Sequence, residues 1–271
     1  MAMLRAVLFD LGGTLVEYEV IPWEELEQQG WRGVYAALLS RGYQVGAWED
    51  FYTVMLGASN RAWERLVGQQ RSSHLHGVMS EGFGELRLDI PETELEHYSL
   101  HFYNGVVEHV QIYEDTLPVL RLLRAHGLKI GLISNTLWPA SMHNRDLERY
   151  GLIDFFDAIT YSSEVAHTKP HPEIFLHTLR RLGVRPDEAA FIGDRLFDDI
   201  SGAQRVGMKG ILKTHPRRLP VEGIIPDAVI DRLAELPDVL ERLFPGAPSP
   251  YRAGWLGACA ARGPHGDGHC S

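Results

Sequence analysis

Four short segments of the chain place carboxylates, hydroxyls or a lysine directly after apolar runs of strand length. In the first, Asp10 follows the run from Ala6 to Phe9 and precedes Leu11-Gly12-Gly13-Thr14. A carboxylate in this place lies where open α/β sheets bind their ligands. Asp and Gly also build ordinary turns, so this segment alone does not distinguish a reactive carboxylate from a turn residue.

The second segment, Ile133-Ser134-Asn135-Thr136, also ends an apolar run and precedes a helical pattern. Hydroxyl and backbone N–H groups in this position can hold phosphoryl oxygens. Ser134 or Asn135 could equally be a helix N-cap without any ligand.

The third segment, Thr168-Lys169-Pro170-His171-Pro172, presents one of only four lysines in the chain at the start of a helix. Lys169 could be a solvated surface residue. Alternatively, its ammonium group could neutralise a nucleophilic carboxylate and the negative charge of a substrate.

The fourth segment ends an apolar run in Gly193-Asp194 and continues to Asp198 and Asp199. Carboxylates at a strand end, with room for water, are the ligands that Mg²⁺ requires. Asp198 or Asp199 could instead cap the following helix and interact favourably with its dipole.

The elements that would position these residues alternate between strand and helix. Strands are predicted by buried apolar runs, and helices by segments of 3.6-residue periodicity. The strands are Ala6 to Phe9, Ile130 to Ile133, Ala158 to Tyr161, Ala189 to Ile192 and Gly210 to Leu212, and the helices are Thr116 to Ala125, Pro172 to Leu182 and Asp198 to Val206. This alternation predicts βαβ crossovers and therefore an α/β fold with a doubly wound parallel sheet.

The pattern changes between the first and second strands, where helical periodicity and dense aromatics replace strand runs. We expect a helical cap domain over residues 17–110, inserted into a catalytic core made of residues 1–16 and 111–244. Residues 245–271 are rich in Gly, Ala and Pro, which predicts a disordered tail. Its ending, His265 to Cys270, has metal-ligand residue types but not the paired spacing of a structural zinc site.

In this order the four segments resemble the four motifs of the haloacid dehalogenase-like (HAD) hydrolase superfamily, over about residues 5 to 240. The resemblance implies a Rossmann-like core with a helical cap and a Mg²⁺-dependent phosphatase that acts on small phosphorylated molecules. Asp10 would attack phosphorus to form an aspartyl-phosphate, which water then hydrolyses.

The resemblance also implies roles for the matching positions. Ser134 and Lys169 would bind the transferring group and act with Asp10 in catalysis. The substrate-binding set would be completed by Gly13, Thr14 and Asn135. Mg²⁺ would be held by Asp10, the backbone carbonyl of Gly12, Asp194 and, directly or through water, Asp199, with Asp198 as a neighbour.

Gly12 departs from the pattern of the family's phosphatases, which usually carry there a second aspartate that acts as general acid and base. A positioned acid/base contributes roughly 10²–10⁴-fold to rate. Three explanations remain open. The substrate has a good leaving group, such as an acyl phosphate or activated aryl ester; or another side chain supplies the proton; or the chain binds a ligand without turning it over. Candidates for the second are Glu17, Tyr18 and Glu19 after the first motif, and His74, His76, His97 and His101 in the cap.

Other branches of the superfamily fit less well. The 2-haloacid dehalogenases need no metal and lack the Gly-Asp motif, so Gly193-Asp194 and Asp199 favour phosphoryl chemistry, although a dehalogenase remains an alternative. Phosphonoacetaldehyde hydrolases need a cap lysine, and the chain has none between Asp10 and Lys129. Phosphomutases need the missing acid/base.

Composition limits the partners and the compartment. A formal net charge of -10 argues against sequence-independent binding of nucleic acid. The chain has no apolar run near the roughly 18 residues of a membrane span and no secretory signal pattern. Both cysteines, Cys259 and Cys270, lie in the tail, so we expect a cytoplasmic protein without a disulfide framework. The sequence leaves the oligomeric state open.

Overall fold

The computed structural model describes residues 3–245 and contains a six-stranded parallel sheet in the order β5-β4-β1-β6-β7-β8. β1 is central, and Phe9 at its end pairs with Leu132 of β4 and Ile192 of β6. The strands are β1 (Ala6–Phe9), β4 (Lys129–Ser134), β5 (Ala158–Tyr161), β6 (Ala189–Gly193), β7 (Lys209–Lys213) and β8 (Ala228–Ile230).

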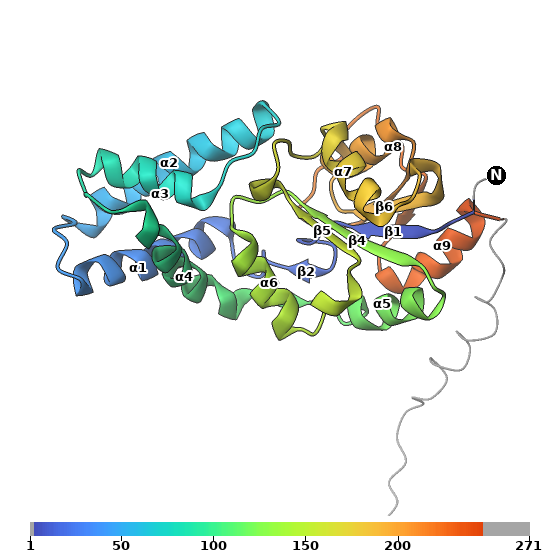
Figure 1. Cartoon of the computed structure of the whole chain (residues 1–271), viewed down its shortest axis with the longest axis horizontal. Helices are drawn as coiled ribbons and strands as arrows, with labels where there is room; N and C mark the ends of the chain where they lie inside the picture. The colour runs from blue at the N-terminus through green and yellow to red at the C-terminus, as the bar shows by residue number, and fades with distance from the viewer. Residues whose placement is uncertain (1–2, 246–271) are drawn as a thin grey trace, which may run out of the picture.

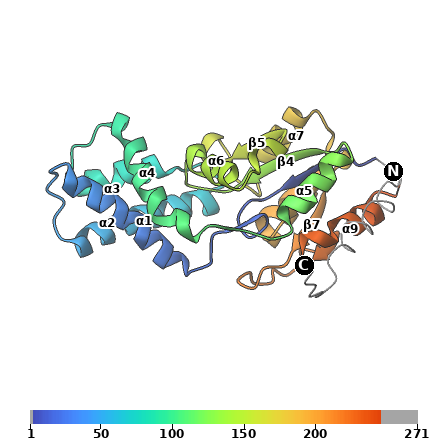
Figure 2. The same ribbon diagram turned by 90° about the horizontal axis from the view of Figure 1, so that it is seen from below.

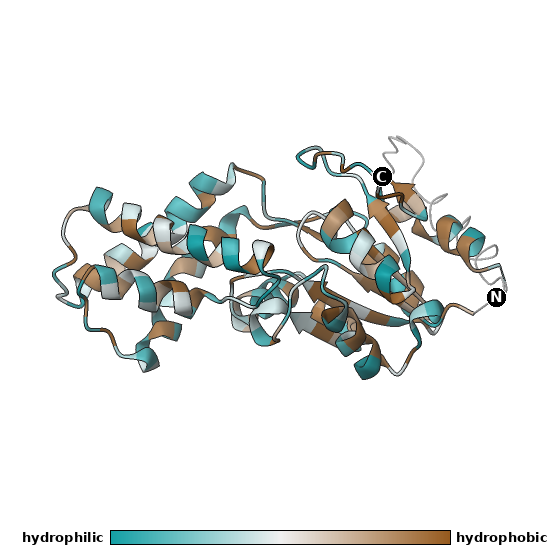
Figure 3. Ribbon diagram, turned by 90° about the horizontal axis from the view of Figure 1, so that it is seen from above, coloured by the Kyte–Doolittle hydropathy of each residue, from teal (hydrophilic) through white to brown (hydrophobic). Residues whose placement is uncertain are grey.

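Helices cover both faces of this sheet, as Figure 1 shows. Successive residues of a strand point to opposite faces. Accordingly, Val7 and Phe9 pack in one hydrophobic cluster with helices α5 and α9, while Ala6 and Leu8 pack in a second cluster with α7 and α8. The strands are apolar, whereas the helices carry hydrophilic residues on their outer sides (Figure 3). The helices of the core are α5 (Thr116–Ala125), α6 (Ala140–Arg149), α7 (Pro172–Leu182), α8 (Gly202–Val206) and α9 (Leu236–Leu243).

The predicted α/β fold with a doubly wound parallel sheet is confirmed, and its five predicted strands are present. The helix predicted over Asp198 to Val206 begins earlier, as a π-helical turn, η6 (Leu196–Ser201), and continues as α8. The sequence reading did not identify the edge strand β8 or helix α9.

The helical insertion is also present and forms a cap region of four helices at one end of the molecule (Figure 2). These helices are α1 (Trp23–Ser40), α2 (Trp48–Gly68), α3 (Leu75–Glu85) and α4 (Leu95–Val106). α1 and α4 pack closely because glycines face the contact. A Cβ at Gly33 would lie 2.3 Å from the His101 carbonyl oxygen, so a side chain there would push the helices apart.

A short antiparallel pair connects the cap region to the sheet. β2 (Val16–Glu17) pairs with β3 (Gln111–Ile112), so the chain leaves and re-enters the core side by side. The predicted boundary between residues 16 and 17 falls inside β2, and the boundary between 110 and 111 falls at the start of β3.

Within residues 3–245 the structure contains no helix with the length and apolarity that a bilayer crossing requires. The predicted tail from residue 246 onward, with the His265 to Cys270 segment, lies outside the described residues.

Candidate functional site

The carboxyl ends of the three central strands bring the predicted motif residues to one edge of the sheet. Asp10 follows β1, Ser134 ends β4, and Asp194 follows β6. All three are buried. Because β1 lies between β4 and β6, these side chains are neighbours in space although they are far apart in the chain.

Lys169 joins this cluster from the loop before α7. Its Nζ donates to Asp10 Oδ1 at 2.6 Å and to Asp199 Oδ1 at 2.7 Å, and its side chain is only 2% exposed. Burial alone would lower the pKa of Lys169, but the two carboxylates raise it above its ordinary value. Lys169 is therefore a buried cation and not a solvated surface lysine, which favours the second of the two interpretations of this segment.

Three carboxylates, of Asp10, Asp194 and Asp199, each present an oxygen within 4.8 Å of the others. Burial and repulsion from Asp199 and Asp194 raise the pKa of Asp10 to about 7, with Lys169 opposing. Burial, followed by repulsion from Asp199, raises the pKa of Asp194 to about 6. Asp198 lies outside this group and faces Arg195, with an N–O distance of 4.0 Å.

The donor set fits a hard divalent cation. Asp194 Oδ1 is buried and has no hydrogen-bond partner among residues 3–245, so it is free to be a ligand. Asp199 is more occupied, because Lys169 bonds one of its oxygens and the Arg195 amide donates to the other at 2.9 Å. Carboxylates in this number and spacing suit Mg²⁺, whose ligands are mostly oxygens.

Two glycines allow the carboxylates to approach the backbone. Gly13 has φ +76°, and a Cβ there would lie 2.4 Å from Asp194 Oδ2. A Cβ at Gly193 would lie 2.3 Å from the Asp199 carboxylate. Any larger residue at either position would displace a carboxylate of the cluster.

The space beside Gly12 is taken by an aromatic ring. A Cβ at Gly12 would lie 3.3 Å from Tyr18 Cδ2, so a side chain there would press on that ring. The Tyr18 hydroxyl points into a buried polar group, where it donates to Asp146 Oδ2 at 3.0 Å and lies 3.2 Å from His143 Nδ1.

This buried polar group connects three parts of the fold. Asp146 on α6 also accepts from the Tyr103 hydroxyl on α4 at 2.8 Å. His143 contacts Thr136 Oγ1, which follows the second motif, at 2.7 Å. Burial lowers the pKa of His143 to about 3 and raises that of Asp146 to about 6.

Asn135 holds the main chain of Lys169 at two points. Its Nδ2 donates to the Lys169 carbonyl, and its Oδ1 accepts from the Lys169 amide, both at 2.8 Å. Its side-chain amide is thus occupied by the protein, and the predicted substrate contact would have to come from its backbone. Ser134, at the end of β4, is only 5% exposed.

The predicted phosphate-binding residues Gly13 and Thr14 lie in the tight turn after Asp10. The Gly13 amide donates to the Val16 carbonyl at 2.8 Å, so this N–H is already used within the turn. Thr14 is fully buried, and its hydroxyl has no hydrogen-bond partner among residues 3–245.

The side chains considered as replacement acids all have other contacts. Glu17 accepts from the Tyr113 hydroxyl and lies against His215, and Glu19 is paired with Arg218. In the cap region, His74 caps α3 by accepting from the Gly77 amide, and His76 lies 3.2 Å from Glu96. His97 and His101 contact each other, with ring centroids 4.7 Å apart.

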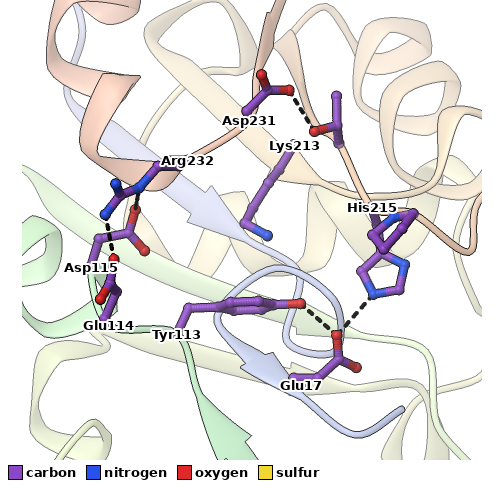
Figure 4. Close-up of a pocket in the computed structure, with 10 residues that line it drawn as sticks. Glu17, Tyr113, Glu114, Asp115, Lys213, His215, Asp231 and Arg232 are labelled. Carbon is purple, nitrogen blue, oxygen red and sulfur yellow. Dashed lines mark hydrogen bonds and ion pairs between the residues drawn. The ribbon is translucent and has the colours of Figure 1, made fainter. Parts of the chain in front are cut away.

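Sequence analysis missed three residues at the end of β7 and in the loop after it, Lys213, His215 and Arg218. Lys213 and His215 line a cavity of about 400 Å³ together with Tyr113 and Glu17 (Figure 4). Lys213 Nζ donates to the Gly13 carbonyl at 3.1 Å and lies 3.8 Å from the centre of the Tyr113 ring. His215 contacts Glu17 at 2.9 Å, and Arg218 donates to Asp194 at 2.5 Å. The signal available in the sequence was Lys213 at a strand end, as one of only four lysines.

A protein-family model described as haloacid dehalogenase-like hydrolase matches residues 4–207, which are most of the chain and include the ends of all three central strands. The chain belongs to this family. Among related HAD proteins, the glyceraldehyde 3-phosphate phosphatase of Methanopyrus kandleri is 32% identical over 250 residues, which cover 89% of this chain and 99% of that protein.

Solved structures of HAD proteins show the same fold. A HAD phosphatase from Thermococcus onnurineus is 30% identical with a TM-score of 0.57, and the match covers 88% of this chain and 98% of that one. A 2-haloacid dehalogenase from Pseudomonas syringae is 25% identical with a TM-score of 0.65, covering 89% and 99%. The family and the fold are therefore established, while the two solved structures are named for different activities, a phosphatase and a dehalogenase.

Proposed function

We propose that this HAD hydrolase is a Mg²⁺-dependent phosphatase of small phosphorylated molecules, with Asp10 as the nucleophile. The observation that carries the proposal is the group of three buried carboxylates, Asp10, Asp194 and Asp199, within 4.8 Å. A metal-independent dehalogenase needs no such divalent-cation site. The phosphatase names of two of the relatives above also support the proposal.

In the first step Asp10 attacks phosphorus. A bond forms between its carboxylate oxygen and phosphorus while the bond from phosphorus to the leaving oxygen breaks, and the leaving oxygen takes the electron pair. In the second step a water oxygen bonds to phosphorus and the aspartyl P–O bond breaks. Asp10 takes back the electron pair as its carboxylate, the proton lost by the water passes to solvent, and inorganic phosphate leaves.

Lys169 keeps Asp10 oriented through its 2.6 Å contact and offers positive charge to the transferring group. Ser134, at the neighbouring strand end, supplies a hydroxyl donor to the phosphoryl oxygens. Asp10, the Gly12 carbonyl and Asp194 would hold Mg²⁺, with Asp199 direct or through water. When bound, the cation neutralises charge that develops on the phosphoryl group.

Gly12 supplies no proton to the leaving group, and Tyr18 directs its hydroxyl to Asp146. The burial and the carboxylate neighbour of Tyr18 raise its pKa well above its ordinary value, which makes this phenol a poor acid. The site therefore suits leaving groups that depart as stable anions, such as acyl phosphates and activated aryl phosphates.

The test is a substrate panel assayed with Mg²⁺ and with EDTA: an activated aryl phosphate, an acyl phosphate, an alkyl phosphate and a 2-haloacid. We expect turnover of the first two, suppressed by EDTA and lowered by at least about 10³-fold in Asp10→Asn, since loss of a nucleophile removes most of the catalysis. The matched control is Asp187→Asn, because Asp187 is exposed and pairs with Arg185.

Two results would contradict the proposal. Halide release that does not depend on metal would identify a dehalogenase instead. Absence of turnover across the panel, with Mg²⁺ present, would favour a ligand-binding or regulatory protein, the alternative that the missing acid at Gly12 supports.

A further inference from the structure

Arg218 is a partly buried cation that lies between the candidate metal site and the segment after β2. Its Nε donates to Asp194 Oδ2 at 2.5 Å, and its second terminal nitrogen donates to Glu19 Oε1 at 2.6 Å. The Arg218 side chain is 19% exposed, whereas that of Asp194 is fully buried. The contact is therefore largely shielded from solvent.

This contact leaves the two oxygens of Asp194 in different situations. Oδ2 is held by Arg218, while Oδ1 is buried without a hydrogen-bond partner among residues 3–245. Gly13 packs against the same Oδ2 oxygen, since a Cβ there would lie 2.4 Å away. A carboxylate with one oxygen fixed in this way cannot rotate freely, so the direction of its other oxygen is set.

Arg218 is itself anchored. The Glu19 side chain accepts a hydrogen bond from its guanidinium group, and the Glu19 amide donates to Glu17 Oε1 at 2.6 Å. Glu17 is held in turn through its other oxygen by the Tyr113 hydroxyl at 2.7 Å and by His215 at 2.9 Å (Figure 4). The chain of contacts thus runs from Asp194 to side chains fixed on β2 and next to β3.

We propose that Arg218 is a positioning residue that orients Asp194 so that its free oxygen faces a bound divalent cation. This inference rests on the proposed function, because it needs the cation site. Groups that hydrogen-bond to metal ligands typically change metal affinity or activity by about 10–100-fold when they are removed.

The opposite expectation follows if Arg218 acts only through its charge. A cation near the site would repel Mg²⁺, so its removal would tighten binding. We expect positioning to dominate because Glu19 already compensates the guanidinium charge at 2.6 Å. Removal of Arg218 would also leave a second buried oxygen of Asp194 without a donor.

The experiment measures the Kd of Mg²⁺ by calorimetry on the whole, substrate-free chain. We expect Arg218→Gln to weaken binding by about 10–100-fold and Arg218→Lys to restore part of the loss. Arg217→Gln is the matched control: Arg217 is 3.9 Å from the same Glu19. It should change the Kd by less than about 2-fold, because the pair that it breaks is long and Arg217 is exposed to solvent.

A second variant keeps the test valid if Arg218→Gln unfolds. Glu19→Gln leaves the guanidinium in place but removes its anchor, and we expect a smaller loss of Mg²⁺ affinity than in Arg218→Gln. An unchanged or tighter Kd in the folded Arg218 variants would overturn the positioning role alone. A wild-type chain that binds no Mg²⁺ would overturn both this inference and the proposed function.

Discussion

At the scale of single residues, the unusual feature is a glycine with an aromatic neighbour next to the nucleophile. Gly12 provides no acid, and Tyr18 Cδ2 would lie 3.3 Å from any Cβ added there. Such a contact is tight, so the buried Tyr18 ring has to move by a few tenths of an ångström to admit a side chain. The cost of that movement is common to every residue that replaces Gly12, so it can be separated from the effect of an added carboxylate.

The first prediction concerns Gly12→Asp compared with Gly12→Ala. Both variants press on Tyr18, but only aspartate adds an acid/base, which is worth roughly 10²–10⁴-fold. We expect alkyl-phosphate turnover to be higher in Gly12→Asp than in Gly12→Ala, by up to about 10²-fold. Steady-state kcat values for the two variants check this. Equal rates would mean that another group already supplies the proton.

The second prediction concerns Lys169→Met. This change leaves Asp10 and Asp199 as buried carboxylates without their cation, and removal of one partner from a buried ion pair costs about 3–5 kcal/mol. Denaturant unfolding of metal-free protein measures the loss. The control is Lys209→Met, whose half-exposed pair with Asp227 should cost less than about 1 kcal/mol. Similar losses in both variants would contradict the buried-cation assignment.

At the scale of elements, Asp146 connects three segments. Tyr18 lies just after β2, Tyr103 on α4 and Asp146 on α6, so two hydroxyl donors tie the cap region and the segment after the nucleophile to the core. Burial raises the pKa of Asp146 to about 6, and both hydrogen bonds oppose that rise.

The third prediction follows from this arrangement. Tyr103→Phe removes one of the bonds that lower the pKa of Asp146, so the folded-state pKa should rise further above that of the unfolded chain. A carboxylate with a raised folded-state pKa stabilises the fold at low pH and loses that contribution as pH rises through the folded-state value. The stability loss in Tyr103→Phe should therefore be about 0.5–1.5 kcal/mol at pH 5 and grow to about 1.5–3 kcal/mol at pH 8.

Urea unfolding at both pH values measures this effect. Tyr161→Phe is the control, because its hydroxyl donates to the neutral Asn144 side chain at 2.9 Å. Its loss should be the same at pH 5 and pH 8. A pH-independent loss in Tyr103→Phe would show that Asp146 does not titrate in this range.

The elements also explain what the sequence could predict. The central strands are short, wholly apolar and bounded by polar residues, so their pattern was sufficient to locate them and to place Asp10, Ser134 and Asp194 at one edge. The edge strand β8 escaped prediction because Val229 is half-exposed and the run is only three residues long.

The contacts made by Arg218, Lys213 and His215 could not be predicted for a different reason. Lys213 ends β7, and His215 and Arg218 lie in the loop after it. The path of that loop depends on tertiary packing, and the three residues are of ordinary surface types. Asn135 was predicted near the site, but its bonds to the Lys169 backbone depend on how two loops meet. Local hydrophobic periodicity does not indicate which loops come into contact.

At the scale of the whole molecule, three buried carboxylates make the metal-free protein less stable than it could be. A ligand that binds only the folded state at 100 times its Kd stabilises by about 2.7 kcal/mol. For a chain of this size that corresponds to roughly 5–10 °C in Tm. The fourth prediction is that saturating Mg²⁺ produces a shift of this order.

Thermal melts with Mg²⁺ and with EDTA test it without any substrate. Asp194→Asn should remove the shift, since it neutralises a carboxylate of the site, whereas Asp187→Asn, which is exposed, should keep it. A shift that survives Asp194→Asn would place the cation elsewhere.

The two hydrogen bonds between Asn135 and the Lys169 main chain fix the loop after β4 to the loop after β5. Grafting the loop after β4 from another enzyme, in order to change the phosphate pocket, would remove the hydrogen bonds that hold the main chain of Lys169. Chimeras should therefore exchange both loops together, although 33 residues separate Asn135 from Lys169 in the printed sequence.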